Sequence, residues 1–383
     1  MMTNADSVSN IQHEPAFLSN IAPFENTGCQ QHREKQLYHN RYICNGKRFN
    51  YHFIECDFID FSFDKMDLSK ISFERCTFKN IKLTNCRLED IRFYNCKIEN
   101  LTCAVTQLAE ICWQQTDLTQ VLWDNCRVEG MLMHNVDIHK LQFAAVTLSQ
   151  WMANSVHLTE CEMRGGSFYD ANWYDCHLEN CQWQRVDIRR QVMGNTRLQA
   201  VSYHKIGGDN YVWHNCRLDQ VNLSALVLNL CSFHRSELIE CELAKTVLLS
   251  GIFTEARLTN CQCPQADFSA AQAERVNFTD CNLQQTLFNR SRLIGSIFDH
   301  CNLSMADFSY AQMCEATVRH CQLNAIKMQQ IRTYAGKDQL SAIAPQDQDK
   351  ILRTIDRWYA RHQPGARENP LFAALPSGVS RYV

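Results

Sequence analysis

Cysteine and histidine are the residues of this chain best suited to do chemistry, and several of them are direct neighbours. The 383 residues include 21 cysteines and 14 histidines. Adjacent pairs occur at Cys176–His177, His300–Cys301 and His320–Cys321. Thiolate and imidazole groups are common zinc ligands, and a cysteine with a histidine can also act as a nucleophile with its base. Which chemistry is available depends on the elements that position these pairs.

A five-residue period governs the segment that carries the pairs. From Phe53 to Leu323 every fifth residue, 55 positions in all, is nearly always large and apolar. A second series two residues earlier is small, and 15 of the 21 cysteines fall in it. Adjacent residues of an extended chain point to opposite sides, so the thiol would face a core and the imidazole would face solvent. We therefore predict no metal site at these pairs.

Other catalytic signatures are also missing from the sequence. It contains no phosphate-binding Walker loop, no nucleophile elbow and no HExxH motif. Only Cys29, Cys44, Cys112 and Cys314 lie outside the two inward series, and none has a recognisable catalytic context. We predict a protein without enzymatic activity and without catalytic, cofactor-binding or metal-binding residues.

A period of five fits neither a helix nor a single strand, and it predicts a solenoid with short flat faces. Like residues recur at a spacing of twenty, as in the series Cys241, Cys261, Cys281, Cys301 and Cys321. This spacing indicates four faces per coil, with like side chains stacked. Fifty-five repeats over four faces give nearly fourteen coils, and a rod roughly 65 Å long at a strand spacing of about 4.8 Å.

The repeat closely resembles the pentapeptide repeat family, whose motif is a small residue, a polar residue, Leu or Phe, and two polar residues. Here it appears as Ala-Asp-Phe at 266–268 and 306–308, as Cys-Asn-Leu at 281–283 and 301–303, and as Cys-Arg-Leu at 86–88. The resemblance implies an all-β fold, a right-handed quadrilateral β-helix.

The cysteines are expected to be reduced. Stacked thiols point the same way and lie a full strand spacing apart, whereas a disulfide needs Cβ atoms about 3.8 Å apart with converging directions. Reduced thiols, no signal peptide and no apolar run of about 18 residues predict a location in a reducing cytoplasm. Secretion by a route that needs no signal peptide is the alternative.

The period divides the chain into five parts. Residues 1–50 lack it and are predicted to be an extended N-terminal segment or cap. Residues 51–323 form the β-helix, and residues 324–345 a connector. Residues 346–362 have the apolar spacing of an amphipathic α-helix, and residues 363–383 form a flexible tail.

The C-terminal parts contribute candidate interaction residues. Ile355, Trp358 and Tyr359 lie on the apolar stripe of the expected helix, and Leu371 and Phe372 form a short apolar cluster in the tail. We consider three roles for the helix: a cap on the last coil, a contact in a homodimer, or a docking element for a partner protein.

Two places inside the repeat depart from its pattern. Trp151 takes a small position and Ala153 the neighbouring large one, which indicates compensation of volume within one coil. Gly207 and Gly208 remove a large inward side chain, and we expect a bulge or a strained corner there, with a binding notch as the alternative.

The charge distribution gives a modest indication of partners. Residues 51–323 carry 24 Lys and Arg against 32 Asp and Glu, a net charge of −8. An outward series at a spacing of twenty, His157, His177, Arg197 and Arg217, makes one face locally basic. An acidic rod repels phosphates, so no direct binding of nucleic acid is expected.

Two functions follow from the resemblance. Some members mimic DNA and occupy type II topoisomerases such as gyrase, which protects these enzymes from quinolones or toxins. Others resemble bacterial scaffolds or adaptors, among them accessory or effector proteins of type VI secretion. The weak net charge and the expected C-terminal helix and tail favour a protein-interaction scaffold, whose partner the sequence does not name.

Overall fold

The computed structural model describes residues 31–333, and this part of the chain contains β-strands and turns but no helix. Consequently it has no helix long and apolar enough to cross a membrane. The strands are β1 (Gln31–Glu34), β2 (Leu37–Ile54), β3 (Asp57–Glu74), β4 (Thr77–Thr84), β5 (Arg87–Tyr94), β6 (Lys97–Ala104), β7 (Gln107–Gln114), β8 (Asp117–Asp124), β9 (Arg127–Thr159), β10 (Glu162–Tyr174), β11 (His177–Glu179), β12 (Gln182–Gln184), β13 (Asp187–Gly194), β14 (Arg197–Gln199), β15 (Ser202–His204), β16 (Gly207–His214), β17 (Arg217–Asp219), β18 (Glu237–Ile239), β19 (Arg257–Thr259), β20 (Asn277–Thr279), β21 (Ile297–Asp299) and β22 (Thr317–Arg319).

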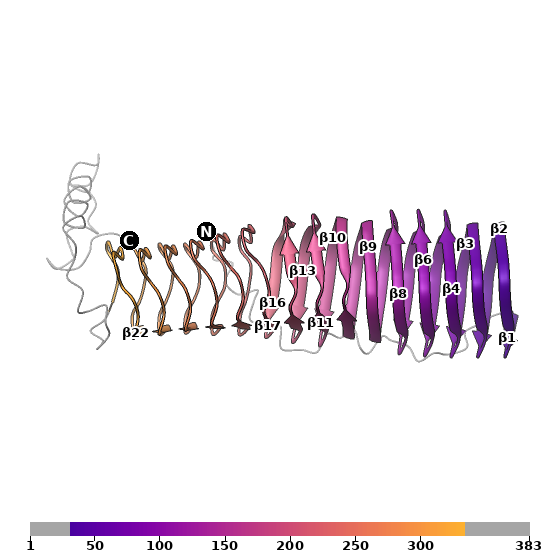
Figure 1. The fold of residues 1–383 in the computed structure, drawn as a ribbon, viewed down its shortest axis with the longest axis horizontal. Coiled ribbons are helices and arrows are strands. Elements are labelled where there is room, and N and C mark those ends of the chain that lie inside the picture. Colours follow the sequence, from indigo (N-terminus) through magenta and orange to yellow (C-terminus); the bar gives the residue numbers. More distant parts are fainter. Residues whose placement is uncertain (1–30, 334–383) are drawn as a thin grey trace, which may run out of the picture.

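All these strands pair in parallel, each with the chain one coil away, and so build a β-solenoid (Figure 1). The register is twenty residues throughout, as in the pairs Phe53↔Phe73 and Leu218↔Leu238. The predicted all-β solenoid with twenty residues per coil is confirmed. Because every coil adds the same rise, side chains twenty residues apart stack along the rod.

Corners recur at every fifth residue. Each residue whose number is a multiple of five, from Lys35 to Gln330, has a positive φ. Glycine fills this position at Gly130, Gly165 and Gly295, and the others are L-residues, often Asn or Asp. Asn and Asp tolerate the left-handed conformation better than most residues because their short side chains can bond locally. Four such corners in each twenty-residue coil give the four predicted faces.

The faces are of two kinds. Up to His214 they are mostly extended strand, and strands such as β9 run on through several corners. After residue 220 most faces are turns, in which the amide of a residue such as Leu226 donates to the carbonyl of Leu223. A positive φ at the third residue, here Ala225, is the signature of a type II turn. Turns are shorter than extended faces, so the coils of the first half are wider.

The core follows the two inward series that the sequence predicts. Large residues such as Phe268 and Leu283 alternate with small ones such as Cys281 and Ala266, and all four are fully or almost fully buried. The exchange of sizes at Trp151 and Ala153 is also found, since both side chains are buried in the same coil.

The solenoid is longer than predicted at its N-terminal end. The corners Lys35 to Asn50 and the pairing of β1 with β2 show that coil structure begins by Gln31, so the boundary at residue 50 is wrong. The apolar period fails there because Arg33 and Arg48 occupy large inward positions of the first coil. At the end of a rod these positions are exposed, so charge is tolerated.

The solenoid also continues beyond Leu323. Bridges Asp307↔Lys327 and Gln312↔Arg332 extend it through the described part of the predicted connector 324–345. Residues 1–30 of the N-terminal segment or cap predicted at 1–50, the helix predicted at 346–362 and the tail predicted at 363–383 lie outside the described residues.

Candidate functional site

The outward series contains a compact group of potential metal ligands. His157 and His177 are register partners, and their rings stack with centroids 4.6 Å apart and planes 4° apart. Glu179 follows two residues after His177 on the same side of the strand, and one ligand atom from each of the three residues lies within 4.8 Å of the others. The Nε2 atoms of both rings are shielded from solvent and form no hydrogen bond with any described residue. Two imidazoles and a carboxylate are the ligand set of open zinc sites.

Electrostatics work both for and against an ion at this group. Burial, then the neighbouring His157 and Arg197, lower the pKa of His177, which keeps its ring in the neutral form that binds metals. Arg197 is, however, the register partner of His177 in the next coil, and its charge opposes a cation. The group could hold a divalent ion only against this repulsion.

The predicted basic stripe is stacked as expected, but only the charge of Arg217 is compensated by acidic neighbours among the described residues. Arg197 donates to Gln199 at 3.1 Å. Arg217 lies 3.2 Å from Glu237 and 3.5 Å from Asp219. The stripe therefore does not present a continuous basic surface.

A second group of potential ligands lies near the C-terminal end of the solenoid. Asp299 accepts hydrogen bonds from Arg319 at 2.9 Å and from His320 at 3.1 Å, and His300 lies 2.9 Å away. The hydrogen bonds from His320 and Arg319 lower the pKa of Asp299. Because this carboxylate is already engaged by Arg319 and by the rings of His300 and His320, the group has the character of a polar network around one ion pair.

Gly207 and Gly208 do not interrupt the rod. Both keep the twenty-residue register, opposite Asp187 and Ile188. Gly208 has a φ of 119°, and a Cβ atom there would lie 1.7 Å from the carbonyl oxygen of Ile188. The expected bulge or strained corner is not found, because the register is unbroken, the corners are Lys205 and Asn210, and glycine adopts a positive φ without strain. Tyr211 is buried beside Gly208, and its hydroxyl donates to the carbonyl of Gly207 at 2.6 Å. The predicted notch is thus occupied by the protein itself.

The thiols of the inward series are part of the core. All twenty described cysteines are free, and most are buried. The thiol of Cys281, for example, donates to the carbonyls of Leu258 and Thr279, both at 3.3 Å. Burial raises the pKa of Cys216 to about 12, and that of Cys176 likewise. Nucleophilic cysteines need the opposite environment.

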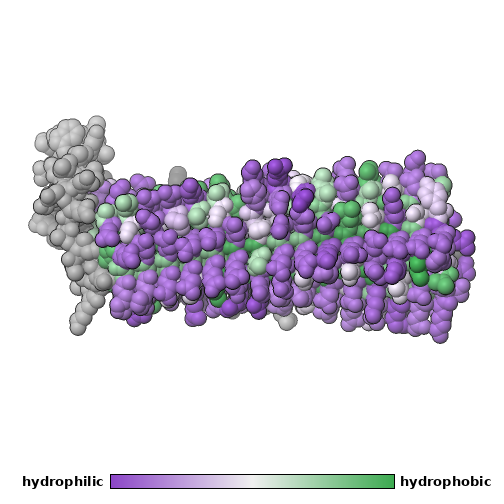
Figure 2. Space-filling model, viewed as in Figure 1, coloured by the Kyte–Doolittle hydropathy of each residue, from purple (hydrophilic) through white to green (hydrophobic). Residues whose placement is uncertain are grey.

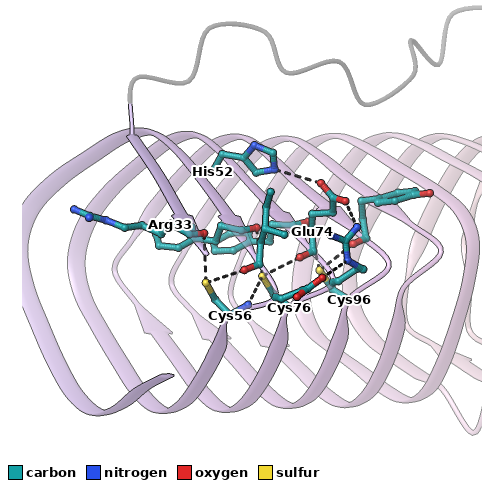
Figure 3. A network of polar contacts seen from close by, with 12 residues as sticks. Arg33, His52, Cys56, Glu74, Cys76 and Cys96 are labelled. Carbon is teal, nitrogen blue, oxygen red and sulfur yellow. Dashed lines mark hydrogen bonds and ion pairs between the residues drawn. The ribbon is translucent and has the colours of Figure 1, made fainter. Parts of the chain in front are cut away.

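A buried polar contact ties the first coils together (Figure 3). His52 is only 4% exposed, and its Nε2 atom lies 3.5 Å from a carboxylate oxygen of Glu74 in the next coil. Arg75 also pairs with Glu74. On the inner side of the same coils the amide of Cys56 donates to the sulfur of Cys76 at 3.4 Å. These contacts join successive coils, and nothing in their geometry indicates catalysis.

An exposed apolar patch, formed by Val227, Leu230, Val247 and Leu249, was not predicted. Three of its residues are strongly exposed: Leu230 by 66%, Val227 by 58% and Leu249 by 40%. They lie on two successive coils, since Val227 pairs with Val247 and the amide of Leu230 donates to the carbonyl of Leu249. Much of the rod is polar, although hydrophobic surface is visible along its length (Figure 2). The five-residue period distinguishes inward from outward positions, but it does not show which outward side chains lie next to one another on the surface. The patch was therefore not predicted.

The remaining candidates, Ile355, Trp358, Tyr359, Leu371 and Phe372, lie outside the described residues.

Comparison with known proteins agrees with this geometry. The family model "Pentapeptide repeats" matches in 8 copies, at residues 52–90, 252–290 and 286–324. No curated protein matches the chain.

Among solved structures, the chain is similar to HetL, a pentapeptide repeat protein involved in heterocyst differentiation regulation in the cyanobacterium Nostoc sp., with 15% identity and a TM-score of 0.30, covering 65% of this chain and 87% of HetL. It is also similar to QnrB1, a plasmid-mediated fluoroquinolone resistance protein, with 14% identity and a TM-score of 0.21, covering 53% and 93%. A third is Rfr23 of the cyanobacterium Cyanothece, with 13% identity and a TM-score of 0.17, covering 33% and 86%. From its repeats, its register and the match of the family model, the chain is a pentapeptide repeat protein.

Proposed function

We propose that this protein is a non-enzymatic interaction scaffold, an adaptor that presents a docking surface on a rigid, right-handed β-helical rod. The observation that supports the proposal is the apolar patch of Val227, Leu230, Val247 and Leu249. Exposed apolar side chains that gather on one place of a soluble protein mark interaction sites more often than scattered ones do. The expected helix at 346–362 would supply a second docking element or a dimer contact.

The rigidity of the patch favours specific docking. Its residues are fixed by backbone hydrogen bonds between coils, such as the one from Leu228 to Val247 at 2.8 Å. A preformed surface loses little conformational freedom when a partner binds. The family resemblance favours a bacterial partner in the reducing cytoplasm, with an accessory or effector role in type VI-like secretion as the more specific form of the proposal.

Site-specific photocrosslinking in cells tests the scaffold. A photoreactive phenylalanine analogue at Leu230 should give a discrete crosslinked protein. Met305 is the matched control because it is also an exposed corner residue with a positive φ, 50% exposed, but lies outside the patch. The same crosslinked products from both positions, or none from Leu230, would refute the patch as a docking surface.

Mimicry of DNA, with protection of gyrase, is the second candidate; the net charge of −8 in residues 51–323 has the sign that it requires but is small for nearly fourteen coils. Its weakness is that acidic side chains alternate with basic ones, as in the ladder Arg235–Glu255–Arg275. A DNA mimic needs uninterrupted negative charge. Gyrase supercoiling assays distinguish DNA mimicry from the scaffold. A mimic that binds gyrase should change supercoiling or its inhibition by a quinolone, whereas a scaffold unrelated to gyrase should leave supercoiling unchanged with and without the quinolone.

A further inference from the structure

The N-terminal coils enclose an apolar cavity of about 500 Å³. It begins at the first coil, where Arg33, Gln36 and Arg48 line it, and it ends at Trp113 and Trp123. Its wall between these ends consists mainly of Phe, Leu and Ile side chains with Cys103. Arg33 and Trp113 are four coils apart in the register, which gives a depth of about 19 Å at the usual strand spacing.

The cavity exists because wide coils here lack the side chains that fill them further on. Six tryptophans occur in the described part of the chain, and all lie between residues 113 and 213: Trp113, Trp123, Trp151, Trp173, Trp183 and Trp213. The coils before Trp113 have the same extended faces but no tryptophan. Cys103 occupies a large inward position between its register partners Leu83 and Trp123, which leaves further space.

The cavity opens at the N-terminal end of the rod, where Figure 1 shows β1 and β2. Phe53 is only partly buried, and Phe93, three coils in from Arg33, is still 8% exposed. At the other end, by contrast, Phe308 and Val318 are 0% and 1% exposed although they lie close to the last coil. Within residues 31–333 the core is thus more accessible from its N-terminal end than from its C-terminal end.

Protein interiors are close-packed, and even an apolar cavity of about 150 Å³ stays dry and takes up apolar ligands. A cavity of this size is in the range of ligand-binding sites.

The guanidinium groups of Arg33 and Arg48 line the opening of the cavity. Within the described part of the chain, neither of them forms an ion pair. Arg48 uses one N–H on the carbonyl of Lys47, at 2.8 Å, which leaves its other donors available.

We propose that this cavity binds a long-chain fatty acid. The carboxylate lies between Arg33 and Arg48, since arginine forms strong, charge-assisted hydrogen bonds with carboxylates. The alkyl chain runs along the phenylalanines toward Trp123. The depth of about 19 Å corresponds to an extended chain of roughly sixteen carbons.

Calorimetric titration of the full chain, first stripped of bound lipid, with palmitic acid tests the proposal. We expect saturable binding of one molecule. The double variant R33Q/R48Q should weaken palmitate binding at least tenfold and leave the binding of hexadecanol, which has no carboxylate, unchanged. R87Q is the matched control because Arg87 faces outward and pairs with Glu89 at 3.0 Å; it should bind palmitate like the wild type.

Cys103→Phe tests the position of the alkyl chain. A phenylalanine at this large inward position fills the cavity, so palmitate binding should fall at least tenfold while the thermal midpoint stays equal or rises. The unchanged or higher midpoint shows that the variant is folded. Absence of saturable palmitate binding by the full chain, or full binding by R33Q/R48Q or by C103F, would overturn the proposal.

Discussion

The hydroxyl of Tyr211 donates to the carbonyl of Gly207 at 2.6 Å, and the tyrosine ring lies inside the coil beside Gly208, the residue that lacks a side chain. Tyr211, a large side chain at a normally small inward position, thus fills the volume that is left empty by Gly208 at a normally large position. The ring also stacks on Trp213, with centroids 5.7 Å apart. Volume in this solenoid is balanced within a coil, not at each position.

Gly208→Ala should destabilise the protein by at least about 3 kcal/mol, because the new Cβ would collide with the carbonyl of Ile188 and the φ of 119° is strained for any L-residue. Gly207→Ala is the control. Its Cβ would meet no atom closer than 3.8 Å and its φ is not positive, so the free energy of unfolding should change by no more than about 0.5 kcal/mol. Urea unfolding followed by circular dichroism measures both. Equal effects of the two variants would contradict the account of this coil.

Val105→Asn should stabilise the protein by about 1 kcal/mol. Val105 is a corner residue with a φ of 50°, where a β-branched side chain is strained and asparagine is tolerated. The side chain is 53% exposed, so little burial is lost. Val227→Asn is a suitable comparison, because Val227 is equally exposed but does not have a positive φ. A gain in the urea midpoint for both, or for neither, would show that corner strain is not the cause.

The sequence predicts the core of this fold well because every residue at the same place in the five-residue repeat points in the same direction, either inward or outward. Cys281 and Phe58 are buried because they occupy inward positions of the repeat. The residues on which they stack are predicted too, since these lie twenty residues away. The period does not predict the coil ends, where exposed inward positions accept Arg48. It also does not predict the cavity, because the width of a coil depends on whether each face is extended or a turn.

The candidate site is predicted only in part, for a related reason. The stacking of His157 on His177 follows from a spacing of twenty, and it is confirmed. The contribution of Glu179 was missed, since it comes from a different outward column of the same face. Glu179 joins the two histidines for two reasons. Residues two apart on a strand point to the same side, and residues twenty apart stack on one another. The group can be predicted only when both spacings are considered together.

Buried thiols should resist alkylation in the native protein. Burial raises the pKa of Cys216 and of Cys231 to about 12, so hardly any thiolate exists at pH 8. Cys44 is exposed and should react within minutes. Iodoacetamide labelling at pH 8, read out for each site by mass spectrometry, checks the prediction. Rapid labelling of Cys216 in the folded protein would mean that the core opens without global unfolding.

Stability should decrease as the pH falls below about 6.5, partly because of His177. Burial, His157 and Arg197 lower its pKa in the folded state, whereas the unfolded chain keeps the ordinary value near 6.5. Below this value the unfolded state binds more protons than the folded state, and protonation then favours unfolding. The contribution is complete above pH 6.5 and is lost as the pH falls toward the lowered pKa of the folded state.

His177→Asn removes this titration, so its free energy of unfolding should depend less on pH between 6.5 and 5 than that of the wild type. His214, whose pKa burial also lowers, still titrates in the variant, and the readout is therefore the difference between the two proteins. Arg197→Gln should have an intermediate effect, because it removes one of the causes of the shift but not the burial. Urea unfolding at a series of pH values, with an NMR titration of the His177 ring, measures both quantities. Identical pH dependence of the wild type and H177N would show that the imidazole of His177 takes up a proton as readily in the folded state as in the unfolded state, which its burial beside Arg197 should prevent.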